Sequence, residues 1–297
     1  MANGLPLPTE LIQMIFSCFD DLDTLGAAIL CCRTFYNAFV RIEEHITTGI
    51  LLKQIHPDVM SDAFAVDASR ILSDRNDGDR KATLQIFLIC MLKIKTGSLP
   101  PPTVWKLSEA LPLSRFHNIV SYFATRLLST ALNGAREDSR EVPRQEALTD
   151  TEVHGVQRAL YRFELYCNMF VGSNLPVARQ RDLFFSHFSV LENDQLSCIY
   201  GLLLEIASEP HNDLVDHDVP RDRDYWQGNY ILSKGLGFLF RLVRNDDYAR
   251  PREHLIIDDD YMHHFLNSVI SSIGDPSTEH PSICQILQAT DRTKKRL

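Results

Sequence analysis

Histidine and aspartate side chains gather in one polar stretch of the chain, residues 208–226. The cluster comprises His211, Asp213, Asp216, His217 and Asp218. Imidazole nitrogens and carboxylate oxygens are ligands of divalent metals, and a loop can fold around an ion. The spacing matches neither the His-Glu-x-x-His pattern of zinc hydrolases nor an EF-hand loop. We therefore expect a solvated acidic loop without a metal, and keep a metal-dependent hydrolase using His211, Asp213 and His217 as a remote alternative.

Other patterns that could support catalysis are incomplete. The segment Gly235-Leu236-Gly237-Phe238 lacks the third glycine of a dinucleotide-binding loop, so we expect it to pack inside a helix. The Gly-x-Ser-x-Gly turn that carries a nucleophilic serine does not occur in the sequence. We therefore predict that the chain is not an enzyme and requires no cofactor.

The overall composition restricts the classes of partner. A net charge of −9 and a pI near 5.6 argue against binding to duplex nucleic acid, which requires a basic surface. No apolar run reaches the about 18 residues of a membrane span, and Asp20, Asp21 and Asp23 interrupt the one candidate signal peptide. Seven scattered cysteines without a Cys-x-x-Cys pair indicate a reducing compartment. We expect a protein of the cytoplasm or nucleus that binds neither nucleic acid nor membrane.

The elements that would position these residues are helices, because apolar side chains recur at spacings of three and four along most of the chain. Segments alternating with period two are nearly absent, so we predict an all-α fold, irregular and without regular repeats. The expected helices cover residues 41–56, 62–72, 81–95, 116–132, 150–170, 182–188, 194–207, 226–243 and 259–273.

One internal segment has no apolar face. Residues 133–149 read NGAREDSREVPRQEALT and cannot bury enough apolar area to offset the entropy of ordering. We expect this segment to be flexible. It would lie within a helical domain of residues 57–290 that follows a separate N-terminal module of residues 5–46.

The N-terminal stretch, residues 7–39, is too apolar for an ordinary surface. On a helix from Thr9, the polar residues Glu10, Gln13, Ser17 and Asp20 form one narrow stripe, and nearly all other positions are apolar. An amphipathic surface helix has a wider polar face. This helix therefore needs apolar contacts on more than one side, from the rest of the chain or from a partner.

The same stretch resembles an F-box, a three-helix module. The family pattern begins with Leu-Pro-x-Glu-Leu, which matches Leu7 to Leu11, and continues with an Ile-Phe pair, here Ile15 and Phe16. It closes with apolar-Cys-Arg-x-aromatic, which matches Cys32, Arg33 and Phe35, although the family often has tryptophan at the last position. The segment Ala159–Phe170 and the remaining helices are similar to uncharacterised filamentous-fungal F-box-like proteins.

The resemblance implies a substrate adaptor of an SCF ubiquitin ligase. Such a module docks on the Skp-family subunit and through it on a cullin, while the helical domain would hold an unknown protein substrate. The implied docking residues are Leu7, Pro8, Leu11, Ile12, Ile15, Phe16, Leu25, Leu30 and Phe35. The alternative is a helical scaffold protein whose F-box-like segment is buried in its own core.

Overall fold

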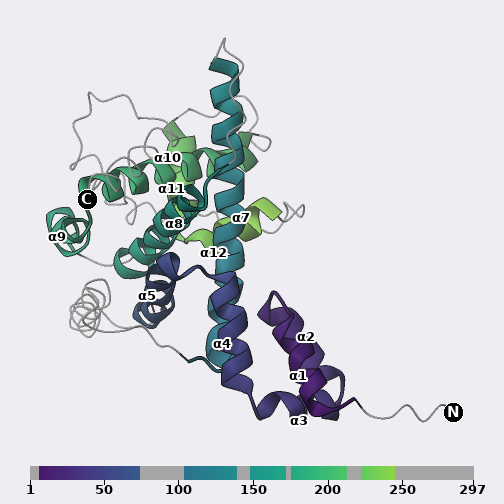
Figure 1. The fold of residues 1–297 in the computed structure, drawn as a ribbon. Helices are drawn as coiled ribbons and strands as arrows, with labels where there is room; N and C mark the ends of the chain where they lie inside the picture. The colour runs from purple at the N-terminus through teal and green to yellow at the C-terminus, as the bar shows by residue number, and fades with distance from the viewer. Residues whose placement is uncertain (1–6, 74–103, 139–147, 172–174, 213–221, 245–297) are drawn as a thin grey trace, which may run out of the picture.

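The predicted all-α architecture is confirmed by a computed structural model that describes residues 7–73, 104–138, 148–171, 175–212 and 222–244. These residues form eleven α-helices and one short 3-10 helix, with no strand among them (Figure 1). None of the helices described has the length and apolarity needed to cross a membrane. The helices expected at 81–95 and 259–273 lie outside the described residues.

The first three helices are short and meet at α3. Helix α1 covers Thr9–Ser17, α2 covers Leu22–Cys31 and α3 covers Arg33–Val40. The Asp21 carboxylate accepts hydrogen bonds from the Thr24 N–H and hydroxyl, both at 2.6 Å, so α2 begins with a side-chain cap. Helix α3 packs against both α1 and α2, and we call these three helices the N-terminal module.

Two helices lead from the module into the rest of the fold. Helix α4 covers Glu43–Gln54 and α5 covers Pro57–Ser73. We expected a helix at 62–72 after a break at Pro57, but Pro57 is the first residue of α5. Proline suits the first position of a helix because its missing N–H would have no partner there. The apolar pattern alone therefore placed the start of this helix too late.

The longest helix extends into the segment that we expect to be flexible. Helix α7 covers Leu107–Asp138, so residues 133–138 of that segment are helical, and residues 139–147 are not described. At its other end, Thr149 caps α8, which covers Asp150–Phe170 as predicted. The Thr149 hydroxyl accepts from the Glu152 N–H while the Glu152 carboxylate accepts from the Thr149 N–H.

The remaining helices are shorter than α7 and pack around α8. Helix α9 covers Val177–Leu183, the 3-10 helix covers Phe185–His187 and α10 covers Val190–Asn212. Helices α11, Asp222–Ser233, and α12, Leu236–Arg244, divide the region that we expected to be one helix. Both α10 and α12 contact α7 or α8, as Figure 1 also shows around the long α7.

The two predicted parts of the chain share one hydrophobic core. Buried apolar side chains form a continuous cluster from Ile12 in α1 to Leu239 in α12. Helices α2 and α4 both contact α7, so the module packs directly on the helical region. A surface ion pair between Arg115 and Asp23, at 2.7 Å, lies at the same α2–α7 contact.

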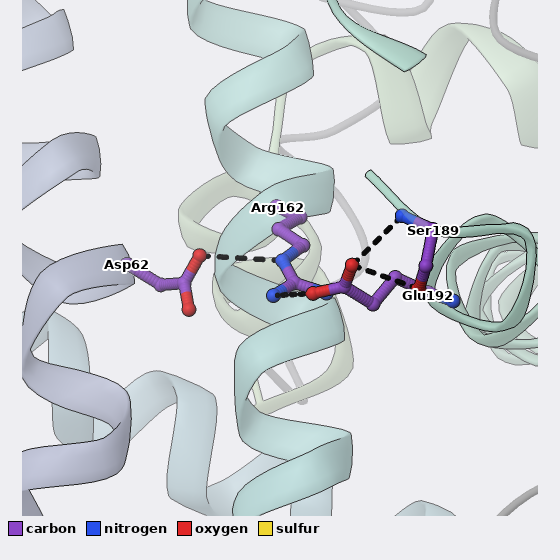
Figure 2. A network of polar contacts seen from close by, with 4 residues as sticks. All are labelled: Asp62, Arg162, Ser189 and Glu192. Carbon is purple, nitrogen blue, oxygen red and sulfur yellow. Dashed lines mark hydrogen bonds and ion pairs between the residues drawn. The ribbon is translucent and has the colours of Figure 1, made fainter. Parts of the chain in front are cut away.

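A buried arginine joins three helices. Arg162 of α8 is almost fully buried, and its guanidinium pairs with Asp62 of α5 at 3.3 Å and with Glu192 of α10 at 2.8 Å (Figure 2). Glu192 also accepts from the Ser189 N–H and hydroxyl at the start of α10, and the Phe188 ring lies 4.8 Å from the guanidinium carbon. A buried charge is tolerated only with such partners. The two ion pairs of Arg162 therefore hold α5 and α10 in position against α8.

A glycine and a half-buried glutamate form the junction of α11 and α12. Gly235 has a positive φ of 81°, and a Cβ atom there would lie 2.7 Å from the Glu164 carboxylate, so only glycine fits. The same carboxylate accepts from the Leu236 N–H at 2.7 Å and so satisfies the start of α12. This corrects the expectation that Gly235 packs within a helix, since it ends one helix and permits the next. Gly237 lies within α12.

Replacement of Glu164 with glutamine should change how stability depends on pH. Burial raises the pKa of Glu164 from 4.5 to about 7, although the Leu236 N–H and the Arg70 charge act in the opposite direction. Between these values the folded chain holds a proton that the unfolded chain has released. The free energy of unfolding therefore falls as pH rises through this window and levels off above it. Glutamine keeps an acceptor for Leu236 but does not titrate.

The measurement is urea unfolding of wild type and Glu164→Gln from pH 4.5 to 8. We expect the stability advantage of wild type over the variant to fall by on the order of 2–3 kcal/mol between pH 4.5 and 7.5, since one pKa unit corresponds to about 1.4 kcal/mol. Burial also lowers the pKa of His117 to about 4, which acts in the opposite direction but equally in both proteins. A difference that stays constant with pH would contradict the raised pKa of Glu164.

Candidate functional site

One face of α1 presents apolar side chains to solvent. Leu11, Met14 and Ile15 are 46%, 64% and 40% exposed, and they follow one another at helical spacing with Cys18, which is also exposed. Large apolar residues that are exposed singly are common, but a row of them along one helix is not. We call Leu11, Met14, Ile15 and Cys18 the α1 stripe.

The opposite face of α1 holds the module together. Ile12 and Phe16 are fully buried, and the Phe16 ring contacts Phe35 edge-on at 5.6 Å and Phe39 at 6.3 Å between ring centres. Leu25 of α2 is also fully buried. We had expected Ile12, Phe16 and Leu25 to contact a partner, and their burial corrects this expectation for the described structure. They support the exposed residues from within the module.

The other predicted docking residues divide between surface and interior. Leu7, Pro8 and Leu30 are exposed, Leu30 to 81%, while Phe35 is half-buried against the core. Sequence analysis did not single out Met14, or Tyr36 and Val40 of α3, which are 52% exposed each. The sequence could have indicated them, because each is a large apolar or aromatic residue in a stretch with little polar surface.

Two hydrogen bonds attach helix α1, which carries the α1 stripe, to neighbouring helices. The Gln13 amide donates to the Ala38 carbonyl at 3.1 Å, which ties α1 to α3. The Lys53 ammonium of α4 donates to the Ser17 carbonyl at 2.7 Å, which satisfies one of the free carbonyls at the end of α1. The stripe is thus carried by a helix that is attached to two others, and its side chains need no reordering of the backbone to reach a partner.

The most buried histidine of the described chain has a structural environment. His117 of α7 contacts the Tyr161 hydroxyl at 2.9 Å through Nδ1 and the Ser121 hydroxyl at 3.2 Å through Nε2. Burial keeps this imidazole neutral, with a pKa of about 4, and raises the pKa of Tyr161. Both side chains are enclosed by the core, so a substrate has no access to them. The group fastens α7 to α8.

Of the residues of the remote hydrolase alternative, the structure places only His211. His211 belongs to the last turn of α10, and Asp213 and His217 lie outside the described residues. That alternative stays untested.

Comparisons of the chain with protein-family models, with curated proteins and with solved structures found no match.

Proposed function

We propose that the chain is a substrate adaptor that docks on the Skp-family subunit of an SCF ubiquitin ligase through the N-terminal module. The α1 stripe, with Leu7, Pro8 and Leu30, forms the contact surface. The helical region that follows residue 57 holds a protein substrate, and the cullin is reached through the Skp-family subunit. The role is one of binding and not of catalysis.

A single observation carries this proposal. The face of α1 that bears Leu11 and Ile15 of the Leu-Pro-x-Glu-Leu and Ile-Phe pattern is exposed, while the opposite face supplies the core of the module. A helix that is apolar on both faces needs an apolar contact on each, and the described chain covers only one of them. A partner with an apolar groove would cover the other.

The direct test is binding of the full chain to the purified Skp-family subunit, measured by calorimetry. Leu11→Glu puts a charge into the apolar contact, where its desolvation is not compensated, and should weaken binding at least about a hundredfold. The matched control is Val190→Glu, because Val190 is also an exposed apolar residue, at 76%, but lies on α10 outside the module. We expect this control to bind like wild type.

Two results would contradict the adaptor. One is a wild-type chain that does not bind the Skp-family subunit. The other is a Leu11→Glu variant that binds as well as Val190→Glu, since the contact would then not use the α1 stripe.

A helical scaffold protein is the second candidate, and one observation favours it. Helix α2 buries Leu22, Leu25 and Ile29, and it packs on α7 of the same chain. Part of the F-box-like stretch is therefore already used as internal core. Under this alternative the Skp-family subunit does not bind, and the module serves only to complete the fold.

A further inference from the structure

Two histidines and an aspartate from distant parts of the chain meet at the start of α5. His56 lies between α4 and α5, Asp58 lies in the first turn of α5, and His154 lies near the start of α8. One ligand atom from each residue lies within 4.8 Å of the others. The two imidazole rings stack with centres 4.0 Å apart and planes 17° from parallel. The group shares no residue with the His211–His217 cluster or with the N-terminal module.

The chemistry of the three donors suits a divalent transition metal. Two imidazole nitrogens and one carboxylate oxygen are ligands of Zn²⁺ and its neighbours, whereas Mg²⁺ prefers oxygen ligands alone. Metal–ligand distances of about 2.1 Å place the donors of a tetrahedral site about 3.4 Å apart. The nitrogen lone pairs lie in the ring planes, so one of the two stacked rings must turn before both nitrogens point at the same ion. The side chains of His56 and Asp58 are 47% and 60% exposed, which leaves them room to turn.

The charges and hydrogen bonds around the three residues affect how well they could hold a cation. Asp150 and Asp58 favour positive charge at His154, and Arg158 opposes it. The Asp58 N–H donates toward His56 Nδ1 at 3.3 Å, and the Asp58 carboxylate lies 3.7 Å from the same nitrogen.

We propose that His56, Asp58 and His154 form a binding site for one divalent transition-metal ion of the Zn²⁺ class, which joins the α4–α5 junction to α8. Three protein ligands leave a fourth position for water, as in an open zinc site. His154 is nearly a hundred residues from the other two ligands in sequence, so the ion binds only the folded chain and stabilises it against unfolding.

The test is calorimetric titration of the metal-free full chain with Zn²⁺, with Mg²⁺ as the comparison ion. We expect one equivalent of Zn²⁺ and no Mg²⁺ to bind. His56→Ala and His154→Ala should each weaken Zn²⁺ binding at least about tenfold. Zn²⁺ should also raise the melting temperature of wild type and leave that of His56→Ala unchanged, and this variant alters an exposed side chain that the core does not need.

Two control variants separate this site from other ligands. His45→Ala removes an exposed histidine of α4 outside the cluster. Cys31→Ser with Cys32→Ser removes two exposed thiols, because cysteine is also a zinc ligand. Both controls should keep the wild-type affinity. The site is overturned if wild type does not bind Zn²⁺, if both histidine variants bind it like wild type, or if only the cysteine variant loses it.

Discussion

Truncation of both Leu11 and Ile15 to alanine should weaken the proposed complex with the Skp-family subunit by roughly two to three decades in dissociation constant. Large apolar anchors at an interface cost on the order of 2 kcal/mol or more when truncated, and about 1.4 kcal/mol corresponds to a tenfold change. The two residues lie one turn apart on the exposed face of α1, so they would enter the same groove.

The folded chain should tolerate the same double change. Both side chains are 40% or more exposed, so their truncation leaves no closed cavity, and we expect the melting temperature to stay close to that of wild type. Leu52→Ala is the control, because Leu52 is 47% exposed on α4 and is not a predicted docking residue. Leu52→Ala should change neither the affinity for the Skp-family subunit nor the melting temperature. If the double variant binds with unchanged affinity, the α1 stripe does not contact the Skp-family subunit. If its melting temperature falls far below that of wild type, both residues belong to the core.

Phe16→Ala should have the opposite effect and destabilise the fold. Phe16 is fully buried, and its ring lies against those of Phe19, Phe35 and Phe39. Removal of a buried phenylalanine side chain typically costs about 3–5 kcal/mol, from lost burial and from the cavity left behind. Urea unfolding of the variant should show a midpoint well below that of wild type.

The control for Phe16→Ala lies two residues before it on the same helix. Met14 is 64% exposed, so Met14→Ala removes a side chain of comparable size without opening a cavity, and we expect a change within about 1 kcal/mol. If both variants unfold like wild type, α1 does not pack on α3 as described. If Met14→Ala is as harmful as Phe16→Ala, the exposed face of α1 is covered by another part of the chain.

The sequence by itself was sufficient to identify the class of fold and its best helices. Apolar residues at spacings of three and four predicted an all-α chain, and Asp150–Phe170 was predicted with the bounds that the structure shows. In that helix periodicity and capping agree, because Thr149 and Glu152 mark its start. Where the two signals diverge, the prediction was less accurate.

The wrong boundaries have local physical causes. Residues 133–138 lack an apolar face, yet they extend α7, because adding a turn to an existing helix costs far less than starting one. Gly235 is expected inside a helix, but it adopts a positive φ at the junction where the next residue, Leu236, donates to the Glu164 carboxylate. Glu164 lies 71 positions earlier in the chain, and no local pattern connects the two residues.

The tertiary structure alone decided which residues of the candidate sites meet and which reach solvent. Helix α1 carries two apolar rows at the same helical spacing, and periodicity cannot choose between them because both satisfy it equally. Packing on α3 and α4 buries the row of Ile12 and Phe16 and leaves Leu11 and Ile15 exposed. Sequence periodicity also does not show that His56 stacks on His154, or that Arg162 pairs with two carboxylates. Contacts between residues so distant in sequence exist only once the helices have packed.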